Sequence, residues 1–147
     1  MANTKKLTIT TSKRSAMKIT RSALKAKRLV YIALANKPLK YRNGRSRIAY
    51  IGTTKKGAPR IADSAAKCAV EALKLHGVSE LSFSVVTCTP RPAVQTWRKL
   101  EAGLILEFKA LYGDQPLCNT QGKRQKWKDE LEYFTAHRLE SVIKKYS

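Results

Sequence analysis

Two short apolar runs on either side of a turn signal constrain the fold of this chain most strongly. Residues 29–35 and 47–52 have the length and composition of strands, and Asn43-Gly44 lies between them. Both residues of that dipeptide tolerate the positive φ angles of a type I′ turn, so we expect a β-hairpin. Its arms carry four cations: Lys40, Arg42, Arg45 and Arg47. These cations either form a solvated sheet edge that discourages aggregation or lie along a nucleic-acid groove, and we favour the groove.

The rest of the chain alternates between helical and strand patterns. Apolar residues recur at helical spacing in residues 60–76, where Gly77 supplies a stop, and again in residues 94–112, where Gly113 does so. Residues 81–88 are rich in Val, Phe and Thr, which is typical of a strand. A last helical pattern covers residues 126–145. This order predicts an α+β fold with a small sheet of about three strands, antiparallel or mixed, flanked by helices.

Composition divides the chain into three parts. Residues 1–27 mix Lys and Arg with Ser and Thr and have few large apolar groups, so we expect a flexible basic N-terminal arm. Residues 28–122 are expected to form one domain. Residues 123–147 are expected to add a C-terminal helix that packs on the same domain.

The charge of the chain points to an anionic partner. Thirty Lys and Arg residues oppose ten Asp and Glu residues, and every acidic residue lies at or beyond Asp63. A net charge of +20 repels a compact state unless a polyanion relieves it. Nucleic acid fits best, because each neutralised phosphate releases condensed counterions. No apolar run is long enough for a membrane span and no secretory signal opens the chain, so we expect a cytoplasmic protein without a membrane partner.

Several common site types lack support in the sequence. Cys68, Cys88 and Cys118 are widely spaced and odd in number, which favours neither a zinc site nor a disulfide framework. Residues 52–57 have the glycine spacing of a phosphate-cradling loop, but Ala58-Pro59 stands where Lys and Ser or Thr are required. Neither histidine belongs to a recognisable acyl-transfer motif.

Glu101 and two tyrosines are the candidate site residues that stand out by position. On a helix, Glu101 falls on the same face as Trp97 and Ile105, where a buried carboxylate needs a cationic neighbour. That neighbour is either a Lys or Arg of a structural ion pair or a metal ion. Tyr31 and Tyr50, taken singly, are ordinary strand residues.

Together these residues resemble the GIY-YIG nuclease family. The resemblance rests on Val30-Tyr31-Ile32, on Tyr50-Ile51-Gly52-Thr53-Thr54, and on three single residues further along the chain: Arg60, Glu101 and Asn119. It covers residues 29 to 121. Leu29 replaces the first glycine of the family pattern, residues 32–49 form a long insertion between the tyrosines, and Ser64 stands where many members carry His.

The resemblance implies a GIY-YIG-like fold and a metal-dependent endonuclease that hydrolyses DNA phosphodiester bonds. Glu101 would ligate one divalent cation, Mg²⁺, and Arg60 would neutralise charge on the phosphoryl oxygens. Tyr31 would be the general base, with a pKa lowered by nearby cations such as Lys55, Lys56 or Arg60, and Tyr50 would position the phosphate or the water. Asn119 would hold the last loop of the site by hydrogen bonds, although it also suits an ordinary loop.

A second function remains open, namely a non-enzymatic nucleic-acid-binding protein of architectural or ribosome-associated type, for which the charge alone suffices. The partner expected in either case is DNA, as a duplex, contacted by Lys55, Lys56 and the cations of the hairpin. Cutting of both strands by a single site would favour a homodimer.

Overall fold

A computed structural model of the protein describes residues 7–10, 28–57, 60–61, 63, 67–68, 70, 77–119 and 126–147. The strands and helices named in this part of the chain are, in order, β1 (Leu29–Tyr41), β2 (Gly44–Thr54), β3 (Leu81–Val86), α3 (Thr96–Tyr112), α4 (Glu130–Tyr133) and α5 (Ala136–Tyr146). The strands form one sheet in the order β2-β1-β3, and both pairings are antiparallel. The expected α+β class with a small sheet is confirmed.

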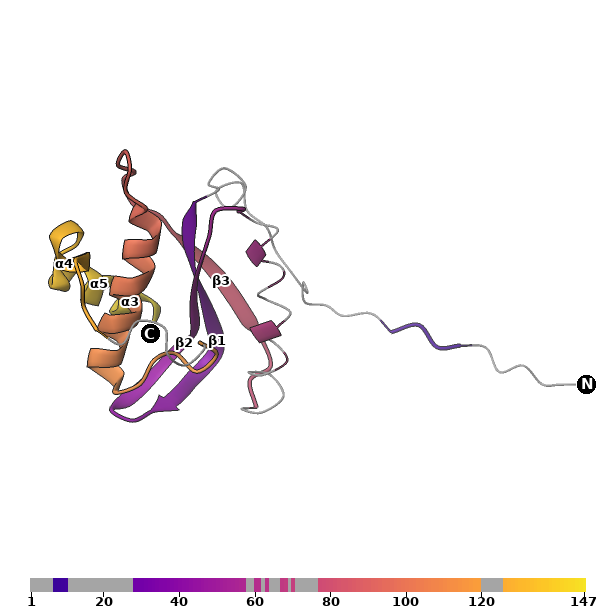
Figure 1. Ribbon diagram of the computed structural model, residues 1–147. Coiled ribbons are helices and arrows are strands. Elements are labelled where there is room, and N and C mark those ends of the chain that lie inside the picture. Colours follow the sequence, from indigo (N-terminus) through magenta and orange to yellow (C-terminus); the bar gives the residue numbers. More distant parts are fainter. Residues whose placement is uncertain are drawn as a thin grey trace, which may run out of the picture.

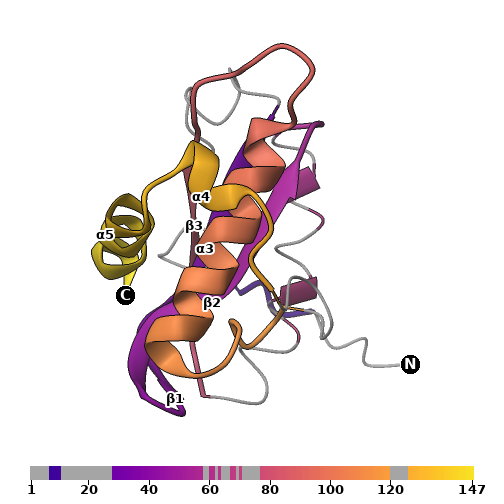
Figure 2. The same ribbon diagram turned by 60° about the vertical axis from the view of Figure 1, so that its left-hand side comes forward.

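The sheet lies between two layers (Figures 1 and 2). In Figure 1, α3, α4 and α5 lie on one side of the sheet, and the described residues from Arg60 to Val70 lie on the other side. Every residue from 29 to 35 is buried, because β1 is the central strand and is covered on both faces. The described residues of the segment after Arg60 include helical positions, of which Cys68 joins the buried core.

The hairpin between β1 and β2 forms at the expected place but with a different turn. Tyr41 pairs with Gly44, so the two loop residues are Arg42 and Asn43 rather than Asn43 and Gly44. Neither Arg42 nor Asn43 has a positive φ, whereas Gly44 has φ +150°. The type I′ prediction is therefore wrong. The hairpin tip also contacts the end of α3, since the Asn43 backbone N–H donates to the Tyr112 carbonyl (3.0 Å).

β1 continues beyond the predicted run because the ladder crosses an irregularity. The pairing jumps from Leu34 with Ile48 to Leu39 with Ser46, which leaves extra residues on β1. The Arg47 Nε–H donates to the Ala35 carbonyl across this gap (3.1 Å). A bulge of this kind bends a strand without ending it, so both strands extend to the hairpin tip.

α3 matches its predicted helix closely and supplies much of the core. Gly113 ends it in the left-handed conformation (φ +85°), as the sequence indicated. The helix packs on β1 and β2. Its predicted apolar stripe is buried at Trp97, Leu100, Leu104, Ile105 and Phe108.

The C-terminal segment differs from the single helix that the sequence predicted. It forms α4 and α5, which are separated at Phe134, where the backbone is extended (φ −134°, ψ 136°). Thr135 then caps α5, because its side chain accepts a hydrogen bond from the Arg138 N–H (3.2 Å). Trp127 precedes α4 and lies outside any helix, and Trp127 and Leu131 are 38% and 50% exposed instead of buried.

Some predictions fall on residues outside this description. Of the predicted N-terminal arm, residues 1–27, only residues 7–10 are described, and they are exposed without regular secondary structure. Ser64 also lies outside the described residues. Within the described part of the chain, no helix is long and apolar enough to cross a membrane.

Candidate active site

Gly52 leaves space for the rings of two tyrosines on the β1–β2 ladder. It pairs with Tyr31 across the β1–β2 ladder, and the rings of Tyr31 and Tyr50 have centroids 5.7 Å apart. A Cβ atom on Gly52 would lie 2.4 Å from Tyr50 Cε1 and 2.7 Å from Tyr31 Cζ. Only a glycine therefore leaves room for both rings in their present positions. Tyr31 is buried (1% exposed) and Tyr50 is half-buried.

The electrostatics of Tyr50 bring Arg60 and Glu101 into the same neighbourhood. Burial is the largest cause that raises the pKa of the Tyr50 hydroxyl. Tyr31 raises this pKa further, by charge interaction and by a hydrogen bond, and the Glu101 carboxylate adds to the effect. The Arg60 guanidinium lowers the Tyr50 pKa but does not offset the other causes. At neutral pH Tyr50 is consequently a neutral phenol that can donate a hydrogen bond.

Glu101 lies where the helical spacing put it. It is 9% exposed, on the face of α3 that also buries Trp97 and Ile105. Glu107 offers a comparison on the same helix, because it is half-buried and its pKa is raised by burial and by Glu140. Glu101 differs from Glu107 because its carboxylate raises the pKa of the Tyr50 hydroxyl.

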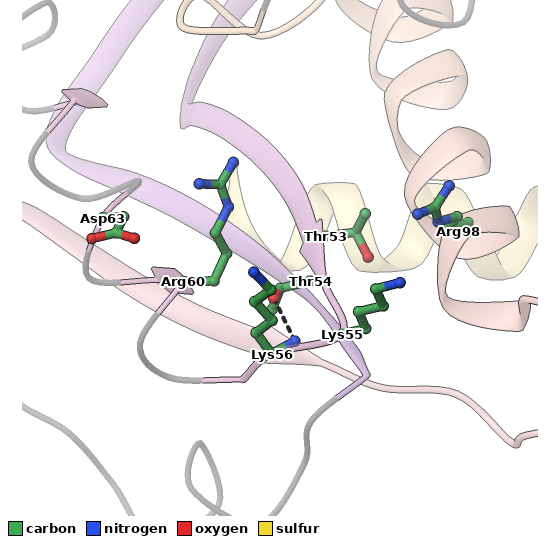
Figure 3. A pocket seen from close by; sticks show the side chains of 7 residues that line it. All are labelled: Thr53, Thr54, Lys55, Lys56, Arg60, Asp63 and Arg98. Carbon is green, nitrogen blue, oxygen red and sulfur yellow. Dashed lines mark hydrogen bonds between the residues drawn. The ribbon is translucent and has the colours of Figure 1, made fainter.

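An open cationic pocket of about 280 Å³ lies beside these residues (Figure 3). Its lining comes from the end of β2, from the turn after it, from the segment that begins at Arg60, and from the first turn of α3. The lining residues are Thr53, Thr54, Lys55, Lys56, Arg60, Asp63 and Arg98. The Thr54 hydroxyl accepts a hydrogen bond from the Lys56 N–H (2.8 Å), which shapes the turn. Four cations face one carboxylate, so the pocket favours an anion such as phosphate.

Asn119 holds the loop after α3 against the edge strand β2. Its Oδ1 accepts from the Ile51 N–H (3.0 Å), and its Nδ2 donates to the Ile51 carbonyl (2.8 Å). The Cys118 N–H donates to the Ala49 carbonyl on the same edge (2.8 Å). These bonds satisfy backbone groups that an edge strand would otherwise expose. Asn119 thus tethers this loop to β2 by two hydrogen bonds.

The predicted nucleic-acid-binding residues fall into two groups. Lys55 and Lys56 line the pocket, at the end of β2. The hairpin cations Lys40, Arg42, Arg45 and Arg47 are exposed near the start of β2. The length of β2 separates the two groups, about 30 Å at 3.3 Å per residue. The hairpin cations therefore do not belong to the pocket.

Sequence reasoning missed Arg98, Thr53 and Asp63 as pocket residues. The signal for Arg98 was its position three residues before Glu101, because residues three apart lie on one side of a helix. The signal for Asp63 was its place one helical turn after Arg60. Thr53 belongs to the motif Tyr50-Ile51-Gly52-Thr53-Thr54, but only the structure shows that it lines the pocket.

Comparison of the chain with known protein families, with curated proteins and with solved structures finds no match.

Among the described residues, no three His, Cys, Asp or Glu side chains gather into a group that could hold a metal ion. Among the cysteines, Cys68 is buried in the core, whereas Cys88 and Cys118 are half-buried.

Proposed function

We propose that the protein is a metal-dependent endonuclease that hydrolyses DNA phosphodiester bonds with a GIY-YIG-type active site. One observation carries this proposal. Tyr31, Tyr50, Arg60 and Glu101 come from four separate segments, yet Tyr50 interacts with each of the other three. Next to them lies a cationic pocket that Arg60 itself lines. A chance pattern of ordinary strand and helix residues would not be expected to converge in this way.

The donor set fits one Mg²⁺ ion shared with the substrate. Mg²⁺ keeps several waters and binds proteins through one or two carboxylates together with phosphate oxygens. Glu101 supplies a single, largely buried carboxylate near the pocket. That set is too small for a cage built of protein ligands alone, but it suits an ion whose other ligands are water and the scissile phosphate. When bound, the ion supplies Lewis-acid polarisation of that phosphate.

The basic residues of the pocket bind and polarise the phosphate in this proposal. Lys55, Lys56 and Arg98 attract the DNA backbone, and Arg60 neutralises charge that builds on the phosphoryl oxygens in the transition state. The guanidinium is suited to this role because it presents several N–H donors in a fixed plane.

In this proposal the two tyrosines activate and position the attacking water. Tyr31, as the phenolate, accepts a proton from the water while the water oxygen attacks phosphorus and the bond to the leaving oxygen breaks. The leaving oxygen takes a proton from solvent, and Tyr50 donates its single O–H to the water or to a phosphate oxygen. The raised pKa of Tyr50 keeps its hydroxyl protonated, which suits a donor and not a base. Without substrate, a hydrogen bond between the two tyrosines orients them, and Tyr50 exchanges this bond for one to the water or to a phosphate oxygen when the substrate binds.

Binding without catalysis is the second candidate function, and the burial of Tyr31 favours it. A side chain that is 1% exposed and packed against Tyr50 and Phe83 (ring centroids 5.7 and 6.3 Å away) also suits a purely structural role. In that case the pocket would hold a phosphate of DNA without cutting it.

A cleavage assay with two matched glutamate variants separates the candidates. Supercoiled plasmid is incubated with Mg²⁺ or with EDTA, and nicked and linear products are followed while binding is measured separately. For a nuclease we expect wild type to cut only with Mg²⁺, Glu101→Gln to bind but cut about 100-fold more slowly or worse, and Glu107→Gln to cut normally. Binding by all three proteins with no cutting would leave the second candidate. Direct formation of linear product would indicate a homodimer.

A further inference from the structure

A second cavity, of about 420 Å³, lies on the other side of α3 from the cationic pocket. The end of β3, the first turns of α3, α4 and α5 all contribute to its lining. Its walls combine two aromatic rings, Tyr133 and Phe134, with two exposed arginines, Arg91 and Arg138. No carboxylate lines the cavity. The first pocket has no aromatic residue in its lining, so the two sites differ in the ligand group they suit.

A turn holds one of these arginines over an aromatic ring. The Arg91 guanidinium lies 5.5 Å from the centroid of the Tyr133 ring. Pro92 and Ala93 form the turn that follows, which the Val94 N–H closes on the Arg91 carbonyl (3.4 Å). Ala93 has φ +59°, a left-handed conformation that is unfavourable for alanine. The surrounding structure therefore imposes this turn, and with it the position of Arg91 beside the cavity.

The chemistry of the walls favours a nucleobase with its phosphate. Bases of unpaired strands stack on aromatic rings and on arginine guanidinium planes, and both surfaces are present at Tyr133 and Arg91. Arg138 provides a further positive charge for the phosphate. A fully apolar ligand would leave the charges of Arg91 and Arg138 without a counter-charge in the cavity.

The position of the cavity relates it to the proposed cleavage site. Thr96 and Leu100 of α3 line the second cavity, whereas Arg98 lines the first. Residues two apart on a helix point to nearly opposite sides, so the first turns of α3 separate the two sites. A helix with its side chains is about 10–12 Å across. About three nucleotides span this width at 3.4 Å per nucleotide along one strand.

We propose that the second cavity binds an unstacked base of an unpaired strand, about three nucleotides from the phosphate in the cationic pocket. A base inside a duplex is stacked and paired and cannot enter, so the preferred substrate is DNA in which a duplex adjoins a single strand. The distance to the cleaved bond rests on the proposed nuclease function. The preference for an unpaired strand does not.

The test measures binding in EDTA, where no cleavage takes place. Fluorescence anisotropy compares a fully paired duplex with the same duplex carrying a single-stranded arm, at one fixed salt concentration. One stacked base contributes enough to give wild type a preference of about five- to 150-fold for the armed duplex. Tyr133→Leu removes the ring and should reduce this preference to less than about twofold. 2-Aminopurine, placed in the arm three nucleotides from the junction, should lose fluorescence on binding wild type but not Tyr133→Leu.

Matched variants separate stacking from charge and from misfolding. Arg138→Ala should lower the preference for the armed duplex. Lys145→Ala is its control, because Lys145 lies on the same face of α5, two turns away and outside the cavity lining. This control variant should keep the preference. Tyr133→Phe retains the ring and should also keep the preference, and thermal unfolding verifies that each variant is folded. Equal affinity of wild type for both substrates, or an unchanged preference in folded Tyr133→Leu and Arg138→Ala, overturns the proposal. A clear preference with no cutting in Mg²⁺ would refute the nuclease and leave this site standing.

Discussion

Replacing Gly52 with alanine tests the architecture of the site most directly. Gly52 is not among the described glycines with positive φ, so an alanine backbone is acceptable there. The added methyl group, however, would lie 2.4 Å from Tyr50 Cε1 and 2.7 and 2.8 Å from Cζ and Oη of Tyr31. Both rings must move, and Tyr31 has little freedom because it is buried in the sheet.

The expected loss of stability follows from two opposing effects. Forcing an extra methyl group into a packed site costs about 1–3 kcal/mol. A glycine-to-alanine change also lowers the entropy of the unfolded chain, which stabilises the fold by about 0.4–1 kcal/mol. We expect a net loss of about 1–2 kcal/mol in the free energy of unfolding, measured by urea denaturation. If the protein is a nuclease, displacement of the tyrosines by about 1 Å should also slow cutting about 100-fold.

Gly103→Ala provides the control for this experiment. Its added methyl group would meet the buried Leu139 side chain at 3.0 and 3.3 Å, so Leu139 must shift by a few tenths of an ångström, a smaller displacement than Gly52→Ala requires. Alanine is also favoured over glycine within a helix by about 1 kcal/mol. We expect this variant to be about as stable as wild type and to cut normally. Our account of the tyrosine site would be refuted by a Gly52→Ala protein that matches wild type in stability and in cutting rate.

Two further predictions concern the loop after α3 and the buried phenols. Asn119→Ala removes both hydrogen bonds to Ile51, so the free energy of unfolding should fall by about 2 kcal/mol and the Ile51 amide should exchange faster. Unchanged exchange at Ile51 would contradict the role of Asn119 as a tether. Burial raises the pKa values of Tyr41 and Tyr50 above the ordinary tyrosine value of 10. Above pH 10 these tyrosines therefore lose their protons in the unfolded state before they do so in the folded state. The free energy of unfolding consequently falls as the pH rises. Denaturation at pH 9 to 11 should show slopes of up to about 1.4 kcal/mol per pH unit per tyrosine, reduced in Tyr41→Phe.

The sequence predicted those parts of the fold that depend on local patterns. The boundaries of α3 followed from its apolar stripe and from Gly113, both of which are local signals. The extension of β1 past Ala35 was not predictable, because the side chain of Arg47 supports the gap in the ladder from another strand. The break between α4 and α5 was also missed, since nothing in the periodicity marks Phe134 as extended.

The residues that the motif selects lie near one another in the structure, but the electrostatics of Tyr50 did not follow from the sequence. The motif selected Tyr31, Tyr50, Arg60 and Glu101, and Tyr50 does interact with each of the others. The raised pKa of the Tyr50 hydroxyl was not predicted, because burial is its largest cause and outweighs the opposing effect of Arg60. Burial depends on how the sheet and α3 pack together, which no spacing of residues in a sequence reveals.

In the proposed nuclease, exposed residues would hold the DNA and buried residues would shape the catalytic centre. Lys55, Lys56 and Arg98 are exposed, so removing their charge should weaken binding and reduce its salt dependence while stability stays nearly constant. Gly52 and Glu101 are buried, so changes there should alter the geometry or chemistry of the centre while leaving the exposed cations in place. In a protein that only binds nucleic acid, affinity resides in the exposed charges, so Glu101→Gln should leave its function intact. Retained binding with loss of cutting in Glu101→Gln would therefore favour the proposed nuclease over the binding protein.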